Sequence, residues 1–423
     1  MEANNVEHSR DTLGAVSRRS VLKSAVVLAA SRRARAAAKG VVLAYVGTYT
    51  PNGQGIHRFQ VDLSTGALTQ PKIFPSTTNP SWIAFDPTHN FLYAVNEISN
   101  FNGTTTGSVT AYSVNQSNGD LTALNTVTSG GSGPAHLSVD PLGKFVFVAN
   151  YGGGNVAVIP IQANGSLANP TDVVNDNTAC SPACAVGPTH AAKAPTGSFA
   201  ISGHDAPHAH MIQADPAGNY VIANDLGLDL TIVWKLDRTT GKLINHQRVP
   251  SSAGAGPRHF AFHPNGRWFY SINEEASTLT FMTYDAAAGT LTPQTEIPTL
   301  PSAFVGTNFT SEVIISRDGR FVYGCNRLHD TVAVFALNGA GRPTLIGEEW
   351  TRGDYPRNCN IDPTGNYLYA CNHRGDSITI FRINDSGSND HGERDDDNHG
   401  GQLRFTGQYV PVGSPAVITF LTI

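Results

Sequence analysis

The sequence predicts an all-β fold, a seven-bladed β-propeller built from four-stranded antiparallel blades. One observation is a pattern of two apolar strands that recurs six times along the chain. Another is that the two ends of the chain hold complementary parts of a seventh unit. The composition agrees, since 42 glycines, 25 prolines and only 14% charged residues favour short strands and turns over long helices.

Each complete repeat consists of an apolar strand, an Asp-Pro-x-Gly turn or a relative of it, a second apolar strand and an asparagine. The first strands of the six copies contain Trp82, Leu137, Ile212, Phe260, Val313 and Cys359. Two more strands follow in most copies, such as residues 108–114 and the strand that begins at the Gly-x-Leu of residues 119–121. A meander of about 45–55 residues with four strands is the size of one propeller blade.

The seventh blade is divided between the chain ends. Residues 41–47, 55–61 and 66–68 supply a second, a third and a fourth strand, and residues 413–420 supply the missing first strand. Pairing these strands closes the ring and removes its exposed edges. An open stack of sheets or two sandwiches are the alternatives, and neither explains the complementary ends. No helical periodicity of useful length follows residue 39.

Residues 1–38 are predicted to be a signal peptide for twin-arginine export. Residues 17–23, Ser-Arg-Arg-Ser-Val-Leu-Lys, resemble the twin-arginine pattern, and a short apolar stretch at residues 24–30 follows. This stretch is far shorter than the roughly 18–20 residues that span a bilayer, so no membrane span is expected. Small residues allow cleavage after Ala36 or Ala38. We therefore expect the twin-arginine export machinery as a partner, and a periplasmic or secreted location. The alternative is that residues 1–38 are only a disordered basic tail.

The propeller domain is expected to cover residues 39–423 and to be acidic. The chain has 28 basic and 33 acidic residues, of which seven and three lie in residues 1–38, so the remainder carries a net charge of −9. That balance argues against nucleic acid as a partner. Two segments interrupt the repeats: an insertion at 163–206 and a polar loop at 384–402. The loop is predicted to be disordered, and it lacks the residue spacing of a known calcium loop.

The five cysteines do not form a disulfide framework, because their number is odd. Cys180 and Cys184 share a loop and could pair after export, whereas Cys325, Cys359 and Cys371 lie in apolar strand patterns and are predicted to be core residues. No CxxC pair is present, which argues against a zinc site.

The candidate site lies where the first strand of each blade starts and the second strand ends. These positions share one rim and converge on the mouth of the central channel. The prolines and asparagines that recur there suit turns, and removing them leaves a set that varies between blades: His136, His208, His210, Arg258, His259, Glu274, Arg327, Arg357 and His373.

This set of side chains suits an anionic small molecule. Arginine binds a carboxylate or phosphate with two donors, and histidine or glutamate can take a proton from water near neutral pH. Hydrogen-bond donors could then stabilise an oxyanion. No Gly-x-Ser-x-Gly motif supports a serine nucleophile. A structural role remains the alternative for several members, since His136 and His259 could simply cap turns.

Residues 41–423 resemble the seven-bladed propeller lactonases, which include a bacterial 6-phosphogluconolactonase type and the fungal carboxy-cis,cis-muconate cyclase. The resemblance is most specific in residues 254–264 with 270–274, and in Pro134-Ala-His136 with residues 145–151. It implies an active-site group of histidine, arginine and glutamate. By motif these are Arg258, Glu274 and either His208 or His210, with His208 preferred.

The resemblance also implies that Arg357 is a second ligand for the anion, and that no metal or organic cofactor is needed. From their place on the same rim, His136, His210 and His259 are expected to bind the substrate. The expected function is an exported hydrolase of a sugar-derived or other anionic lactone. A phosphorylated sugar lactone fits poorly with export, because the phosphogluconate pathway runs in the cytoplasm. Two alternatives remain open: a propeller that binds a ligand or protein without catalysis, and a lactone-forming cycloisomerase of the muconate type.

Overall fold

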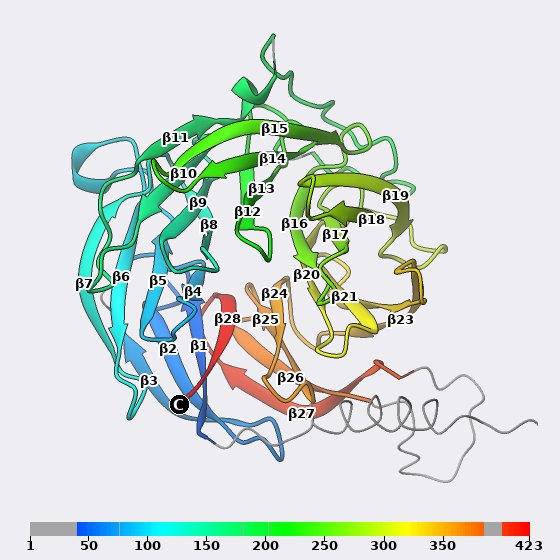
Figure 1. Ribbon diagram of the computed structural model, residues 1–423. Coiled ribbons are helices and arrows are strands. Elements are labelled where there is room, and N and C mark those ends of the chain that lie inside the picture. Colours follow the sequence, from blue (N-terminus) through cyan, green and yellow to red (C-terminus); the bar gives the residue numbers. More distant parts are fainter. Residues whose placement is uncertain (1–39, 76, 181, 202, 385–399) are drawn as a thin grey trace, which may run out of the picture. The chain divides into compact units, whose positions relative to one another are not determined.

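The computed structural model describes residues 40–384 and 400–423, except residues 76, 181 and 202. Within these residues, 28 strands form seven antiparallel sheets of four strands each, arranged as blades around a centre (Figure 1). The predicted seven-bladed propeller is confirmed. The predicted signal peptide (1–38) and most of the predicted disordered loop (385–399) lie outside the described residues.

Each blade runs from an inner strand at the channel to an outer strand at the periphery. The inner strands are β28 (Pro415–Thr422), β4 (Ile83–Phe85), β8 (Pro134–Val139), β12 (Ala209–Ala214), β16 (Pro257–Phe262), β20 (Thr310–Ile315) and β24 (Pro356–Ile361). The second strands are β1 (Val42–Thr48), β5 (Phe91–Asn96), β9 (Phe145–Asn150), β13 (Tyr220–Asp225), β17 (Trp268–Asn273), β21 (Phe321–Asn326) and β25 (Tyr367–Asn372).

The third and fourth strands complete the meander of every blade. The third strands are β2 (Ile56–Val61), β6 (Ser108–Val114), β10 (Asn155–Pro160), β14 (Leu230–Asp237), β18 (Thr278–Asp285), β22 (Thr331–Leu337) and β26 (Ser377–Ile383). The outer strands are β3 (Leu68–Phe74), β7 (Leu121–Thr128), β11 (Asp172–Asn175), β15 (Lys242–Pro250), β19 (Thr290–Pro298), β23 (Pro343–Trp350) and β27 (Leu403–Pro411). Two short 3-10 turns are η1 (Phe101–Gly103) and η2 (Asp176–Ala179).

The ring closes as the split ends predict. Strand β28 pairs antiparallel with β1, with Leu43 opposite Leu421 and Tyr45 opposite Thr419. In Figure 1 the red C-terminal strand therefore lies beside the blue N-terminal strand. One blade thus joins segments from both ends of the described chain, and β1 is paired along both of its edges, with β28 and with β2.

The core lies between neighbouring blades. Tyr93 and Val95 of β5, for example, pack against Leu137 of β8 and Val148 of β9, and all four side chains are fully buried. The Tyr93 hydroxyl donates a hydrogen bond to the Gly165 carbonyl of the next blade at 3.0 Å. The same kind of bond recurs from Tyr270, Tyr323 and Tyr369. Cys325, Cys359 and Cys371 are buried free thiols, as predicted.

A β-bulge near the start of several inner strands decides which side chains reach the channel. The pairing of β16 with β17 shifts between Pro257 and His259, and that of β24 with β25 shifts between Pro356 and Asn358. In β12 the shift lies between Ala209 and Met211. A bulge leaves one residue unpaired and turns its side chain. The unpaired residues in these strands are Arg258, Arg357 and His210.

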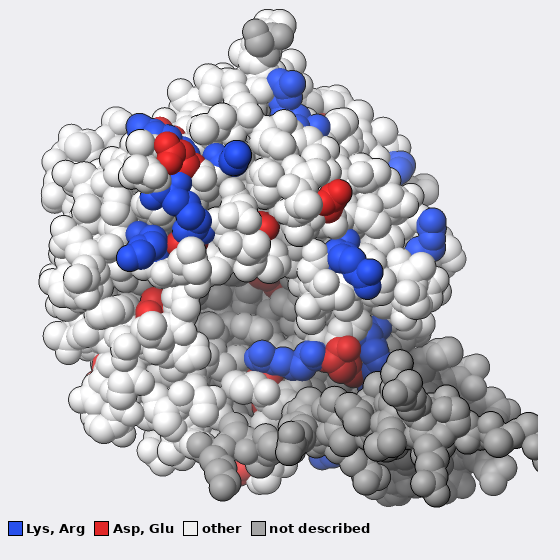
Figure 2. All heavy atoms as spheres, in the orientation of Figure 1, with Lys and Arg blue, Asp and Glu red and all other residues white. Residues whose placement is uncertain are grey.

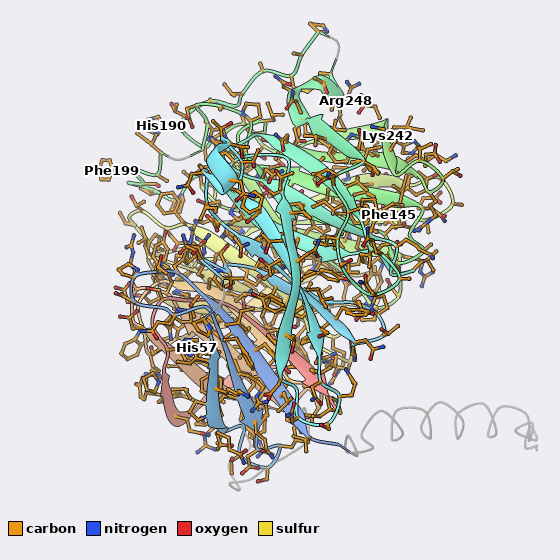
Figure 3. All side chains as sticks on the ribbon, turned by 90° about the vertical axis from the view of Figure 1, so that its left-hand side faces the viewer. His57, Phe145, His190, Phe199, Lys242 and Arg248 are labelled. Carbon is orange, nitrogen blue, oxygen red and sulfur yellow. A yellow bond between two sulfur atoms is a disulfide. The ribbon has the colours of Figure 1, made fainter. Side chains whose placement is uncertain are left out.

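The two rims of the ring differ. His190 and Phe199 lie on one side of the molecule, and Phe145 and Lys242 lie on the other (Figure 3). The predicted insertion contains β11 and the disulfide Cys180–Cys184. It then runs across the loops of two following blades, where Ala192 N–H donates to Ala253 and Gly306 N–H donates to Thr196.

The centre of the ring is hollowed on the face shown in Figure 2, and basic and acidic side chains are scattered around it. A cavity of about 370 Å³ lies at the ends of β16, β20 and β24 that are remote from the bulges, and Phe262, Ser316 and Asn360 line part of it. Among the described residues no helix is long and apolar enough to cross a membrane.

Candidate active site

Two arginines and a glutamate form the most tightly packed charged group at the channel. Glu274 follows the last residue of β17, and its Oε2 lies 2.9 Å from Nε of Arg258 and 2.7 Å from Nη2 of Arg327. Arg258 also donates from Nη1 to the Ser311 carbonyl at 2.6 Å. Arg327 lies over the rings of Phe309 and Tyr355. Arg258 is 1% exposed and Arg327 4%, so water screens this group little.

The charges in this group act on one another. Burial and the nearby Arg327 lower the pKa of Arg258 to about 10. Burial alone would raise the pKa of Glu274, but the charges of Arg327 and Arg258 outweigh it and hold that pKa below its usual value. Glu274 is therefore a firmly ionised counter-ion and a weak base, and the group keeps a net positive charge.

Arg357 forms a second cationic group on the same rim. It donates from Nη2 to the Tyr49 hydroxyl at 2.7 Å and lies over the Tyr49 ring. Tyr49 donates in turn to Oε2 of Glu97 at 2.5 Å. The ring of His373 packs edge-on against Tyr49 at 5.1 Å, and burial with the charge of Arg357 lowers the pKa of His373 to about 4.

Three of the predicted histidines meet in the channel. The His259 ring lies 5.0 Å from that of His210 and 5.5 Å from that of His136, measured between ring centres. Trp82, from another blade, lies 4.3 Å from His136 and 5.1 Å from His259. Burial, together with neighbouring positive charges and histidines, holds the pKa of all three histidines well below the usual range, so they are neutral at pH 7.

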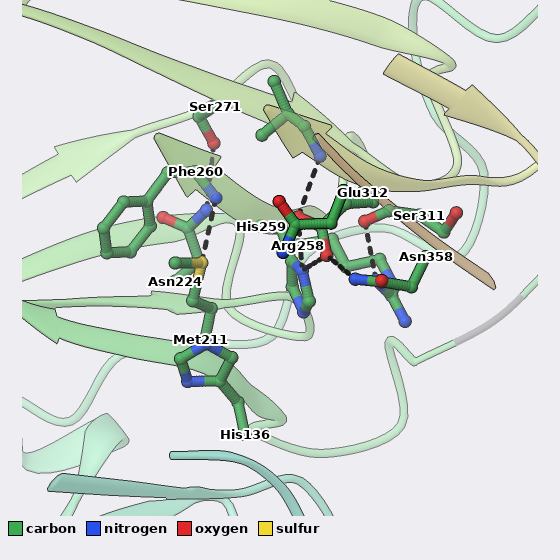
Figure 4. Close-up of polar contacts among 12 residues, drawn as sticks. His136, Met211, Asn224, Arg258, His259, Phe260, Ser271, Ser311, Glu312 and Asn358 are labelled. Carbon is green, nitrogen blue, oxygen red and sulfur yellow. Dashed lines mark hydrogen bonds and ion pairs between the residues drawn. The ribbon is translucent and has the colours of Figure 1, made fainter. Parts of the chain in front are cut away.

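Glu312 stands behind His259 (Figure 4). Nδ1 of His259 lies 3.1 Å from both carboxylate oxygens, and Asn358 donates from Nδ2 to Oε2 at 2.6 Å. The backbone N–H of Val313 donates to Oε1. Burial raises the pKa of Glu312 to about 7, although Arg258 and these hydrogen bonds oppose the rise.

His208 lies apart from the other histidines. Its ring stacks on Tyr151 at 4.3 Å, and its two nitrogens face the Tyr151 carbonyl and Oδ1 of Asp205, each at 2.9 Å. Its backbone N–H donates to Asp225 at 2.9 Å. Both ring nitrogens are thus occupied, whereas the ring of His210 contacts Tyr151 edge-on at 5.5 Å, and its Nδ1 has no hydrogen-bond partner among the described residues.

A buried cluster of charged side chains connects the inserted segment to the rim of the site. His204 lies 3.2 Å from Oδ1 of Asp229 and 3.4 Å from Oε2 of Glu275. Burial alone would lower the pKa of His204, but hydrogen bonds and charge from both carboxylates raise it to about 10. Asp229 also accepts the backbone N–H groups of Gly254 and Gly256, just before Arg258. This group therefore positions the strand that carries Arg258.

The structure brings most of the predicted residues to one rim and adds others that sequence reasoning missed. Glu312, Tyr49, Tyr151 and Trp82 also take part. Glu312 stands at the start of an inner strand, the position that selected the other candidates, so the signal was available. In the described part of the chain no group of three or more His, Cys, Asp or Glu side chains is arranged to hold a metal ion.

Comparison with known proteins agrees with this geometry. The family model described as lactonase, 7-bladed β-propeller, matches residues 43–420. The chain belongs to this lactonase family. It is 34% identical over 325 residues to a 6-phosphogluconolactonase of Bacillus subtilis, a match that covers 76% of this chain and 85% of that protein. A 6-phosphogluconolactonase of Pectobacterium carotovorum is 31% identical over 320 residues, covering 74% and 83%.

Among solved structures, the periplasmic gluconolactonase of Pseudomonas aeruginosa superposes on this lactonase with a TM-score of 0.76 and 26% identity. The match covers 90% of this chain and 99% of that one. Both the fold and the lactone-hydrolysing class expected from the sequence are therefore confirmed, and the roles of individual residues remain predictions.

Proposed function

We propose that this lactonase hydrolyses an anionic, sugar-derived lactone outside the cytoplasm, as an enzyme similar to 6-phosphogluconolactonase. The observation that carries the proposal is the convergence of Arg258, Arg327 and Arg357 on one rim, with Glu274 as the carboxylate that pairs with two of them. A surplus of buried positive charge attracts an anion and discriminates against a neutral substrate.

The roles follow from the contacts of each side chain. Within the described residues Nη2 of Arg258 has no hydrogen-bond partner, so it is the donor for the lactone carbonyl and for the oxyanion that forms there. Arg357 binds the acid group of the substrate. Glu274 pairs with both Arg258 and Arg327 and holds them in place.

A histidine removes the proton from the attacking water. His210 suits this role better than His208, because both ring nitrogens of His208 are already engaged. Since burial and the nearby arginines hold the pKa of His210 well below its usual value, the ring is neutral and available as an acceptor at pH 7. The sequence-based preference for His208 therefore gives way to His210 in this proposal.

The test is acid release from a panel of lactones by the purified protein, with the spontaneous rate subtracted. The panel contains 6-phosphogluconolactone, gluconolactone and simple γ- and δ-lactones. We expect turnover of acidic lactones, and a loss of about 100-fold or more in kcat for Arg258→Ala, the size of effect typical when an oxyanion donor is removed. Arg267→Ala, an exposed arginine at the other end of the same blade, is the matched control. A folded Arg258→Ala enzyme with full activity would contradict the assignment.

Export is proposed from residues 17–23 and is consistent with the periplasmic location in the name of the Pseudomonas aeruginosa relative. Replacing Arg18 and Arg19 by lysine should retain the protein in the cytoplasm, as read by fractionation. The same exchange at Arg32 and Arg33 is the control. Equal export of both variants would argue for another route.

A further inference from the structure

A buried carboxylate lies behind the histidines without a role in the proposed reaction. We propose that Glu312, His259 and His210 form a proton relay that leads from the floor of the site to the attacking water. The inference rests on the proposed function and adds to it the group on which the water's proton finally resides. His210 is then the catalytic residue, and His259 and Glu312 are positioning and relay residues.

The inner half of the relay is a hydrogen-bonded pair. Both oxygens of Glu312 lie 3.1 Å from Nδ1 of His259, so this nitrogen donates and the opposite nitrogen, Nε2, is left as an acceptor. Asn358 holds the carboxylate in place, and its own Oδ1 accepts the N–H of Ile418 at 3.1 Å. The pair is therefore fixed from an adjoining blade.

The outer half is the contact between the two histidines. Their rings are inclined by 70° with centres 5.0 Å apart. Nε2 of His259 and Nδ1 of His210 are both buried, and neither has a hydrogen-bond partner among the described residues. Trp82 and His136 pack against the His259 ring and limit its movement. No hydrogen bond joins these two nitrogens in this arrangement, so the His210 ring has to turn before Nδ1 donates to Nε2 of His259.

The charges around the site explain why a relay is useful. His210 is buried and also faces the charges of Arg258, Arg357 and Arg327, and both effects disfavour a positive charge on its ring. His259 feels the same arginines, and Glu274 opposes them only in part. Of the groups that face this line, which also include His136, Glu312 has a pKa of about 7, close to the working pH. A proton that reaches Glu312 therefore leaves both rings neutral.

The chemistry balances without another reactant. The water oxygen bonds to the lactone carbonyl carbon while its proton passes to His210. The proton on Nδ1 of His210 passes to Nε2 of His259, and the proton on Nδ1 of His259 passes to Glu312. When the bond between the carbonyl carbon and the ring oxygen breaks, the transfers reverse and the ring oxygen receives the proton. The products are the hydroxy acid and the unchanged enzyme.

The experiment measures kcat and KM between pH 5 and 9 for the wild-type protein and the variant Glu312→Gln. Because the relay accepts a proton only when Glu312 is ionised, wild-type activity should rise with pH through about 7. In Glu312→Gln this rise should disappear and kcat should fall about 100-fold, the lower end of typical acid–base effects, with KM unchanged. Glu312→Asp keeps the carboxyl group and should keep the pH-dependent rise.

The matched control is Glu348→Gln, because Glu348 also pairs with a histidine, His329 at 3.3 Å, but stands on outer strand β23. It should leave the profile unchanged. His259→Gln interrupts the same line without altering the carboxylate and is read by the same profile, so misfolding of one variant does not hide the outcome. Wild-type turnover together with an unchanged profile in Glu312→Gln and His259→Gln would overturn the relay alone. No wild-type turnover of any lactone would overturn the proposed function itself.

Discussion

Replacing Glu274 by glutamine tests whether the stability of the buried pair Arg258 and Arg327 depends on one carboxylate. Oε2 of Glu274 is the shared partner of Arg258 at 2.9 Å and of Arg327 at 2.7 Å, and all three side chains are at least 90% buried. Glutamine has nearly the same shape and keeps one oxygen. The substitution therefore removes the negative charge while the two buried guanidinium groups stay side by side.

The expected cost can be worked from these contacts. Removing one partner of a buried ion pair costs about 3–5 kcal/mol. The amide oxygen of glutamine still accepts one hydrogen bond, which retains about 1 kcal/mol. We therefore expect the free energy of unfolding to fall by roughly 2–4 kcal/mol. Adding Arg327→Gln removes the uncompensated charge, so the double variant should be more stable than the sum of its parts by about 1–3 kcal/mol.

Urea unfolding, followed by tryptophan fluorescence at low ionic strength, measures these values. Phosphate should stabilise Glu274→Gln more than the wild-type protein, because a bound anion replaces the lost carboxylate. Glu348→Gln, in a more exposed pair with His329, should cost no more than about 1 kcal/mol. A loss below about 1 kcal/mol for Glu274→Gln, or strictly additive losses in the double variant, would refute the view that Glu274 compensates the two arginines.

Three further predictions concern the inserted segment and the predicted histidines. The disulfide Cys180–Cys184 closes a very short loop, so replacing both cysteines by alanine should cost roughly 2 kcal/mol by chain entropy, read from unfolding with and without reductant. The raised pKa of His204, about 10, means that its stabilisation is complete below about pH 6.5 and is lost as the pH rises toward 10. His204→Gln should therefore flatten the decline of the unfolding midpoint over this range; an equal decline in both proteins would contradict it. His210→Gln should reduce kcat about 100-fold and His208→Gln less than about threefold, and the reverse order in acid-release assays would restore His208 as the base.

The architecture was predictable because a propeller repeats one strand pattern in every blade. Six copies of one strand pattern and two complementary ends determine the number of blades and their closure without any knowledge of side-chain contacts. The confirmed pairing of β28 with β1 needed only the counting of strands. The same repetition located the rim of the site, because the ends of antiparallel strands coincide in every blade.

The bulges were not predictable from the pattern of apolar residues. A strict alternation would send Arg258 and His259 to opposite faces of β16. The shift in pairing between Pro257 and His259 lets Arg258 reach Glu274 while His259 reaches Glu312. A bulge depends on the partner strand and the blade packing around it, and a single sequence records neither.

The end of β13 is a smaller case of the same limitation. Asn224 resembles the asparagines that end the other second strands, but the strand ends at Asp225. Asp225 accepts the backbone N–H groups of His208 and Leu228 through Oδ1. The aspartate in this position therefore stabilises the turn that carries His208.

The position of Glu312 was visible in the sequence, but its contacts were not, because its partners lie far away in the chain. His259 and Asn358 stand 53 and 46 residues from it. In the sequence its neighbours are Ser311 and Val313, which suggest an ordinary strand start with one charged residue. A charge of that kind is usually assigned to solvent, whereas here it is 4% exposed and paired with a histidine. A carboxylate that stays buried beside a neutral imidazole is costly for folding unless a partner compensates it. The cost of keeping Glu312 there is the strongest physical reason to look for its role in proton transfer.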